Sequence, residues 1–396
     1  MKQSKLKNGL PYIIIPSKTD LVTISFAVNV GSNDESPNVN GISHFLEHLI
    51  FEGTKKYRTS LELNQVIDNF GGELNAMTSK NRTTVYLKVP KKFFKEALSV
   101  VSDMIIRPTF KKEIFEKEKQ VVLHEIEQTY DEPRHYQWLV FEEALFKKHP
   151  AKQSIAGTTD IVSKITIADV KKHHSSYYTI ENSLLVVNGN VGRREIALCE
   201  AAFADLPHSK AVKKNATLEK NTFTKKNVKK DIQLSHFIRG YKVPASGTKD
   251  GFVLEVIEAI LSKGQTGWMF DEFRIKRGLA YEVRAHHESE NSGSFFALNV
   301  ITQKKNLALT RKLINELCVR LQTVDDETVT NAKNNIYGKH LLSYDESISH
   351  THIVSENYFD NVGDYLKSIE KVTTAAVRRV AKKLFTKEYT EIVLGK

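Results

Sequence analysis

Two segments far apart in the chain follow the same pattern of helix and strand signals. Each begins with a threonine placed to start a helix, carries a valine four residues later, and ends in a short apolar run followed by glycine. A repeat on this scale predicts two structural units of one kind. The matching positions are Thr166 with Thr373, Val170 with Val377 and Gly189 with Gly395, and the spacings differ by one residue.

Other parts of the chain repeat in outline. The β-rich stretch 22–29 has a counterpart at 234–240, and the strand-then-helix pattern of 83–106 has one at 295–321. A chain of 396 residues is too long for one compact core and natural for two domains. We therefore expect an α+β fold of two similar domains, each an antiparallel-rich sheet packed with helices.

The net charge of +11 is concentrated in one polar stretch between these halves. Residues 206–230 hold eight lysines against one glutamate, which accounts for seven of the eleven positive charges. A lysine run between two apolar-patterned halves is typical of a solvated linker. No aromatic residues are interleaved at the spacing that a single-strand binder would use. We expect an N-terminal domain over 1–205, a basic linker over 206–230 and a C-terminal domain over 231–396, with no nucleic-acid partner.

The segment 41–54 contains the sequence HFLEH. In a helix, His44 and His48 lie one turn apart on one face with Glu47 beside them. Two neutral imidazoles at that spacing can hold one zinc ion, and the order His-x-x-Glu-His is the inverzincin signature. Apolar neighbours bury most of this helix, and buried His and Glu side chains need partners or a metal. The matching helix of the second half, 251–262, carries no histidine.

A catalytic zinc site usually takes a third protein ligand and leaves one position for water. The long charged helix expected over 111–131 offers several candidates, and spacing alone does not choose among them. The candidates are Glu113, Glu116, Glu118, His124, Glu125 and Glu127.

These motifs together resemble the pitrilysin (M16) family of zinc metallopeptidases over essentially the whole chain. Glu125 follows His48 by 77 residues, and Glu118 precedes Glu125 by seven, as in that family. The resemblance extends to segments before and after HFLEH. Its further residues are Gly31-Ser32, Glu35, Gly41-Ile42-Ser43, Phe51, Gly53-Thr54, Gly71-Gly72, Asn75-Ala76 and Thr78.

The resemblance implies one zinc ion per chain, held by His44, His48 and Glu125. It implies Glu47 as the general base that takes a proton from a zinc-activated water, and Glu118 as a carboxylate that supports the site. The strand around Asn75, Ala76 and Met77 is expected to pair with an extended peptide, which requires an unfolded substrate. The expected activity is that of a metalloendopeptidase.

The second half is expected to contribute substrate contacts. Arg274 and Tyr281 match a family pair that binds the substrate backbone near the scissile bond. The alternative is a solvated arginine and a packed tyrosine. The loop 263–268 departs from the Gly-rich run that the family has there, and Trp268 puts its substrate contacts in doubt.

The length resembles the short-subunit, processing-peptidase-like branch of the family, in which two subunits enclose a chamber. Because the zinc motif and the Arg/Tyr pair occur on one chain, we expect a self-sufficient homodimer or monomer, with the homodimer favoured, that closes around an unfolded peptide. No apolar run is long enough to span a membrane, and Cys199 and Cys318 fit buried thiols of a reducing compartment. The expected location is cytoplasmic.

Two other readings stay open. The chain could be a non-catalytic or partner-dependent subunit of a processing complex, although such relatives typically lose a zinc residue and this chain keeps them all. It could also be a nucleic-acid-binding protein that uses the basic stretch.

Overall fold

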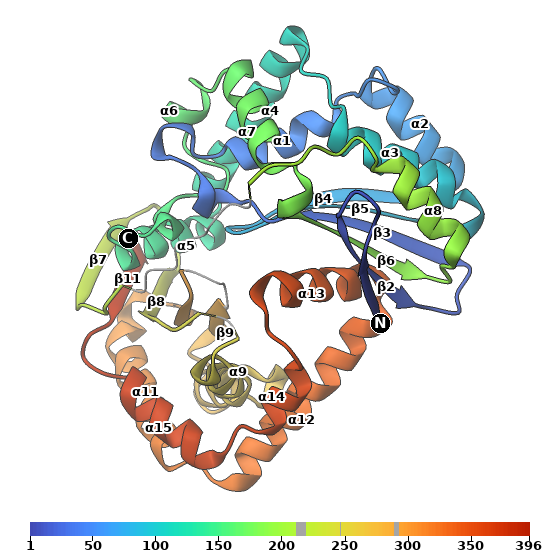
Figure 1. The fold of residues 1–396 in the computed structure, drawn as a ribbon. Coiled ribbons are helices and arrows are strands. Elements are labelled where there is room, and N and C mark those ends of the chain that lie inside the picture. Colours follow the sequence, from blue (N-terminus) through green and yellow to red (C-terminus); the bar gives the residue numbers. More distant parts are fainter. Residues whose placement is uncertain (211–218, 246, 289–292) are drawn as a thin grey trace. The chain divides into compact units, whose positions relative to one another are not determined.

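The computed structural model describes residues 1–210, 219–245, 247–288 and 293–396, without the side chain of Tyr281. The chain divides into two compact units (Figure 1). Unit 1 comprises Met1–Gln128, Gln153–Lys214 and Ser343–Phe359, and unit 2 comprises Thr129–Lys152, Asn215–Leu342 and Asp360–Lys396. None of the helices in the described ranges combines the length and apolarity that a membrane crossing requires.

Unit 1 is built on a six-stranded sheet in the order β1-β2-β6-β3-β5-β4. Strands β2 and β6 are parallel, and all other neighbours are antiparallel. The strands are β1 (Lys2–Lys5), β2 (Pro11–Pro16), β3 (Leu21–Val28), β4 (Glu73–Thr78), β5 (Thr83–Pro90) and β6 (Ser183–Gly189).

Helices cover one face of this sheet around a large apolar core. Phe26 of β3 and Leu87 of β5 are fully buried in that core, together with Phe45 and Leu46 of α1. The α-helices of unit 1 are α1 (Ile42–Phe51), α2 (Ser60–Phe70), α3 (Phe94–Ile106), α4 (Lys112–Asp131, mostly in this unit), α6 (Thr159–Val162), α7 (Ile167–Tyr177) and α8 (Arg193–Ala202).

The opposite face of the first sheet is covered by a helix from late in the chain. Ile13 of β2 and Val186 of β6 pack against Val354, Tyr358 and Phe359 of α13 (Ser347–Asp360). Strand β6 is buried along its whole length, since both faces of the sheet are covered there.

Unit 2 has a five-stranded sheet in the order β7-β11-β8-β10-β9. Strands β7 and β11 are parallel and the other neighbours antiparallel, so the order and directions match those of β2-β6-β3-β5-β4. The predicted repeat and fold class are confirmed. The strands are β7 (Thr224–Lys229), β8 (Ser235–Lys242), β9 (Ala280–Glu288), β10 (Phe295–Thr302) and β11 (Thr390–Gly395).

Both faces of the second sheet are also covered. One face packs against an apolar core in which Ile257 of α9, Ile314 of α11 and Val377 of α15 are buried. The helices of unit 2 are α5 (Pro133–Leu145), α9 (Lys249–Ser262), α10 (Trp268–Phe270), α11 (Leu307–Arg320), α12 (Asp326–Asp345, mostly in this unit), α14 (Tyr365–Glu370) and α15 (Thr374–Leu384).

The other face of the second sheet carries α5, which comes from the first half of the chain. Phe141 of α5 lies directly over Gly240 of β8, where an added Cβ would come within 2.4 Å of the ring. Each half of the chain thus supplies one helix to the other unit.

The basic stretch 206–230 is not wholly a linker. Its last part, Thr224–Lys229, is strand β7, which pairs with β11. Every second side chain of β7 is exposed, and the others are half-buried. The lysines fit an edge position, because the pairing uses backbone groups and the charged side chains reach solvent. Residues 211–218 of that stretch lie outside the described residues.

Candidate metal centre

Helix α1 begins on a buried carboxylate. Glu35, which is 6% exposed, accepts hydrogen bonds from the backbone N–H groups of Gly41 (2.7 Å) and Ser43 (2.8 Å) and from the Asn40 side chain (2.9 Å). A carboxylate at this position satisfies N–H groups that a helix start leaves without partners, and it is favoured by the helix dipole. Burial raises the pKa of Glu35, and these hydrogen bonds act in the opposite direction. Glu35 therefore fixes where α1 starts, two residues before His44.

A second contact holds the same turn of α1 from the side of α7. The hydroxyl of Ser43 and Nε2 of His173 form a hydrogen bond of 3.1 Å, and both residues are buried. Burial lowers the pKa of His173 to about 3, so the ring is neutral at physiological pH. The start of α1 is thereby tied to two different segments of unit 1.

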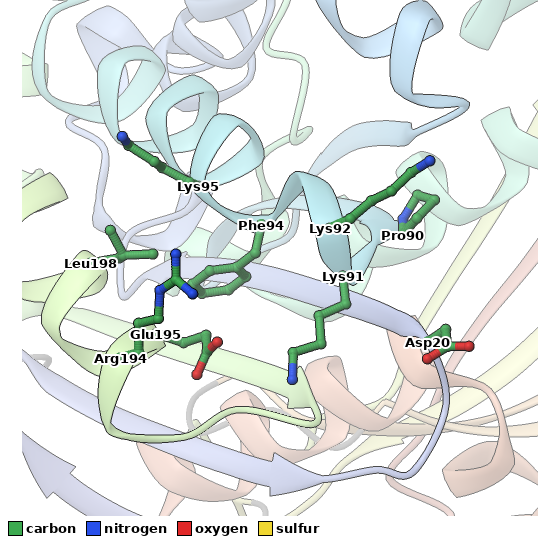
Figure 2. Close-up of a pocket in the computed structure, with 9 residues that line it drawn as sticks. All are labelled: Asp20, Pro90, Lys91, Lys92, Phe94, Lys95, Arg194, Glu195 and Leu198. Atoms are coloured by element: carbon green, nitrogen blue, oxygen red, sulfur yellow. The ribbon is translucent and has the colours of Figure 1, made fainter.

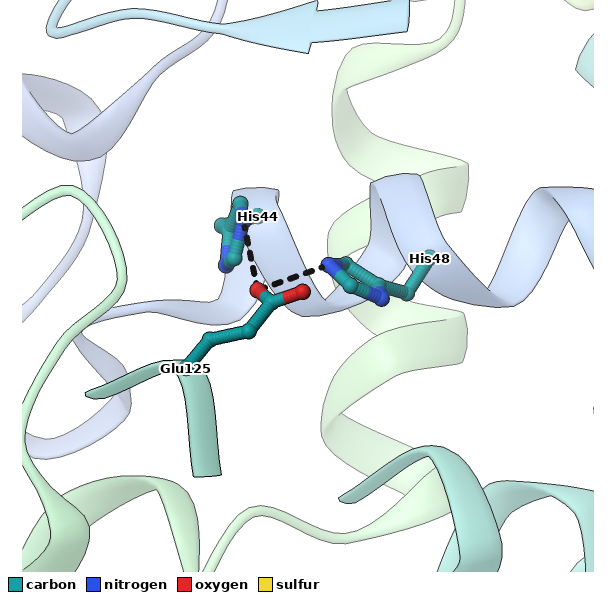
Figure 3. A group of neighbouring side chains, drawn as sticks. All are labelled: His44, His48 and Glu125. Atoms are coloured by element: carbon teal, nitrogen blue, oxygen red, sulfur yellow. Dashed lines mark ion pairs between the residues drawn. The ribbon is translucent and has the colours of Figure 1, made fainter. Parts of the chain in front are cut away.

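The three residues expected as metal ligands lie together (Figure 3). His44 and His48 project from one side of α1 toward Glu125 of α4, and one ligand atom from each residue falls within 4.8 Å of the other two. Oε2 of Glu125 is 3.6 Å from Nε2 of His44 and 3.3 Å from Nε2 of His48. This is the one group of three potential ligands found among the described residues. Among the acids of α4, Glu125 is the one that completes this group.

Glu118 of α4 lies beside His48 but is not part of the three-residue group. Its Oε2 is 3.7 Å from Nδ1 of His48, the ring nitrogen other than the one that faces Glu125. Burial raises the pKa of Glu118, with a contribution from the charge of Glu52. Burial also lowers the pKa of His44 to about 4, and the neighbouring His48 acts in the same direction. His44 is therefore a neutral imidazole at physiological pH, the form that binds metals.

Glu47 is held by the adjacent edge strand. The Thr78 hydroxyl at the end of β4 donates a hydrogen bond to Oε2 of Glu47. Burial raises the pKa of Glu47, whereas the Thr78 hydrogen bond and His48 lower it. Glu47 lies one residue before His48, so its carboxylate belongs to the same turn of α1 as the ligand cluster.

Strand β4 carries the residues expected to bind a peptide. It ends the first sheet, with β5 as its neighbour on one side only. Asn75 and Met77 are exposed, while Ala76 is half-buried on the other face. An edge strand presents unpaired backbone groups to which an extended chain can add.

The expected substrate residues of the second half lie in unit 2. Arg274 is exposed in a π-helical turn, η7 (Asp271–Ile275), 5.1 Å from the centre of the Phe270 ring. Tyr281 belongs to strand β9, and its side chain lies outside the described residues. Trp268 packs against the core of unit 2, and the Arg320 guanidinium lies 3.8 Å from its ring centre. Trp268 thus packs the end of the loop 263–268 against unit 2.

Sequence reasoning assigned no role to Thr78, Ser43 or His173. Thr78 and Ser43 stood in the motif that carries the family resemblance, but their partners are 31 and 130 residues away. Their neighbours in sequence gave no sign of these contacts. The sequence did not show the hydrogen bonds of Glu35 either, because they depend on how the loop before α1 folds back.

Comparison with known proteins places this geometry in a family. Residues 12–159 match the family model described as insulinase (peptidase family M16), and residues 164–336 match the one described as peptidase M16 inactive domain. A protein of Mycobacterium leprae named an uncharacterized zinc protease is 30% identical over 93% of this chain and 85% of its own. The chain belongs to peptidase family M16.

Further M16 relatives cover nearly the full length. A protein of Bacillus subtilis, also named an uncharacterized zinc protease, is 27% identical over 98% of this chain and 97% of its own. The crystal structure of a protease from Helicobacter pylori superposes with a TM-score of 0.93 at 25% identity, covering 100% of this chain and 99% of that one. The ligand cluster falls within residues 12–159, so the match described as inactive concerns the half that lacks it.

Proposed function

We propose that the protein is a zinc-dependent endopeptidase that hydrolyses unfolded peptides, with Glu47 as the general base. The observation that carries the proposal is the convergence of His44, His48 and Glu125 beside Glu47. The names of two relatives, both printed as uncharacterized zinc proteases, support the broader class of activity, and every residue that the M16 resemblance requires is present.

The residues fit a zinc ion. Two imidazoles and one carboxylate form the three-ligand set of a catalytic zinc site with an open position. Glu118 faces the second ring nitrogen of His48, as carboxylates do beside metal-binding histidines. Nε2 of His44 and Nε2 of His48 both face Oε2 of Glu125, so one potential ligand atom from each residue gathers in one place.

The roles of the side chains follow from their positions. A zinc ion held by His44, His48 and Glu125 would supply Lewis acidity toward a water molecule and the scissile carbonyl. Glu47 accepts the proton of the attacking water and passes it to the leaving amine. Thr78 holds one carboxylate oxygen of Glu47, which leaves the other oxygen for the water.

Substrate binding completes the proposal. The outer edge of β4, around Asn75, Ala76 and Met77, pairs with the backbone of an extended peptide. Arg274 and Tyr281 bind the substrate backbone, and the protein works as a homodimer whose enclosing chamber admits unfolded chains only. Strand addition reads the backbone more than side chains, so broad sequence tolerance follows.

The test compares three proteins on a library of quenched, unstructured peptides, with bound zinc measured in each. Wild type and the control Glu127→Gln, which removes an exposed carboxylate of α4, should cleave and bind zinc alike. Glu47→Gln should keep its zinc and lose activity by roughly a thousandfold or more, because it removes the group that accepts the proton. Equal activity in Glu47→Gln would overturn the assignment of the base.

The competing function, a partner-dependent or non-catalytic subunit, is separated by the same assay. Zinc binding without cleavage in wild type, followed by cleavage after a second protein is added, would support it. Wild type that binds no zinc would overturn the metallopeptidase proposal itself.

A further inference from the structure

A cavity lies in unit 1 between the starts of two helices. It is a cavity of about 730 Å³ where the helical run 91–106 and α8 begin (Figure 2). Phe94 and Leu198 form its apolar side, and Asp20 and Glu195 are its two acids. The backbone N–H of Lys91 donates to the carbonyl of Asp20 over 2.7 Å, which fixes the loop before β3 against the helix start.

Cations outnumber acids around this cavity by four to two. The cations are Lys91, Lys92, Lys95 and Arg194. In the part of the chain that the structure describes, none of the four enters an ion pair or a side-chain hydrogen bond. The helical run also begins without a side-chain cap at Pro90, so its N-terminal partial positive charge adds to theirs. The cavity therefore carries a net positive charge.

Two of these cations face each other across the cavity. Figure 2 shows Lys91 and Arg194 on either side of Phe94, with Glu195 between them, while Lys92 and Lys95 point outward. Glu195 accepts a hydrogen bond of 2.8 Å from the N–H of Gly192 and so serves as the cap of α8. This hydrogen bond lowers the pKa of Glu195, and the charges of Lys91 and Arg194 add to the effect. The Glu195 carboxylate, which lies between the two cations, is thus already hydrogen-bonded to the start of α8.

The cavity is separate from the metal cluster. Thr83, at one end of β5, pairs with Thr78, which holds Glu47, and Pro90 lies at the other end of the same strand. Seven residues of extended strand span about 23 Å. A ligand in the cavity therefore does not reach the ligand cluster.

We propose that this cavity binds a small molecule with a condensed phosphate chain. A ligand with a single negative charge would add no more than the charge that Glu195 already places between the cations. A chain of phosphates can instead contact both Lys91, at the start of the helical run 91–106, and Arg194 of α8. Arginine binds phosphate oxygens in pairs, and lysine adds a point charge. Phe94 and Leu198 offer an apolar side for a nucleoside attached to the chain.

The test is direct titration calorimetry on the full chain at low ionic strength, without peptide substrate or divalent metal. The probes are tripolyphosphate, ATP and, as a carboxylate control, citrate. Wild type should bind both phosphate probes saturably and citrate more weakly. ATP that binds more tightly than tripolyphosphate would assign the apolar side to the nucleoside, and equal affinities would assign the site to the phosphate chain alone. No saturable binding of either phosphate probe would overturn the proposal.

Matched variants locate the binding. Lys91→Gln with Arg194→Gln should weaken tripolyphosphate binding about tenfold or more, because two charged hydrogen-bond donors are lost. Lys164→Gln with Lys171→Gln makes the same charge change at exposed positions away from the cavity and should bind like wild type. Equal weakening in both pairs would show unspecific charge attraction and overturn the proposal.

A third variant moves the affinity in the opposite direction. Glu195→Gln keeps an oxygen for the Gly192 N–H but removes the negative charge between Lys91 and Arg194, so tripolyphosphate should bind several-fold more tightly. Unchanged or weaker binding, with the melting temperature preserved, would contradict the placement of the phosphate chain. Because no readout involves cleavage, these results are independent of the proposed peptidase activity.

Discussion

The hydroxyl of Thr78 donates a hydrogen bond to Oε2 of Glu47, and this bond joins the edge strand β4 to the helix that carries both histidines. The carboxylate is therefore oriented from the same strand that is proposed to bind the peptide. A threonine in this place can act on catalysis without touching the substrate.

Replacing Thr78 by valine should lower kcat about 10- to 100-fold, the range typical for loss of a group that orients a site residue. KM should change little and bound zinc should stay constant, because the ligand cluster is intact. Steady-state kinetics on a quenched peptide give both constants. Thr78→Ser keeps the hydroxyl and should recover most of the rate. A serine variant as slow as the valine variant would point to packing of the threonine methyl group.

Glu35 should matter for stability and for metal binding together. Glu35→Ala leaves two backbone N–H groups without their buried acceptor and removes one of the two hydrogen bonds of the Asn40 amide, at an expected cost of about 3 kcal/mol in the free energy of unfolding. Because the start of α1 positions His44, zinc affinity should fall as well. Urea unfolding and a zinc titration measure the two effects. Zinc affinity equal to wild type would show that α1 is positioned without this carboxylate.

Glu255 of α9 predicts a pH-dependent stability. Burial raises its pKa to about 7, although the Tyr365 hydroxyl donates to it, while the unfolded chain has the ordinary value of 4.5. The folded state holds this proton more tightly, so the contribution to stability is complete below about pH 4.5 and is lost as the pH rises through about 7. Above that pH, the charged carboxylate costs about 3 kcal/mol.

Glu255→Gln removes this cost and keeps an oxygen for Tyr365. Its melting temperature should exceed that of wild type above pH 7, and the difference should disappear toward pH 4.5. Glu316→Gln, at an exposed position of α11, is the control and should follow wild type at every pH. A constant difference between Glu255→Gln and wild type across the pH range would rule out titration of Glu255 as the cause.

Much of this fold could be read from local patterns. The Thr166/Thr373 repeat predicted two related units, and the sheets indeed share strand order and direction. The sequence could not predict that α5 covers the second sheet and α13 the first. An apolar helix face such as that of Phe141 shows that the helix packs against a core, but not which sheet it covers. Strand β7 was hidden for a related reason. Its lysine-rich sequence has only Val228 as an apolar residue, and its pairing is set by β11.

The candidate site divides in the same way. His44 and His48 are one helical turn apart, so their sequence spacing already fixed that they face the same side. Glu125 was one of several acids on α4 by spacing, and only the family resemblance singled it out before the structure showed it beside the histidines. Thr78 and His173 act through contacts between distant segments, which no local pattern encodes.

The last prediction concerns Glu391 of β11, a carboxylate buried in unit 2 at 1% exposure. Its oxygens accept from Arg239 at 2.8 Å and from Arg311 at 2.8 Å, and Arg239 is itself 3% exposed. Glu391→Ala should lower the free energy of unfolding by about 3–5 kcal/mol, because a buried guanidinium is left without its counter-charge. Glu316→Ala breaks an exposed pair with Lys312 and should cost less than about 1 kcal/mol. Urea unfolding followed by circular dichroism compares the two. Similar small losses would mean that water reaches Arg239 and replaces the carboxylate.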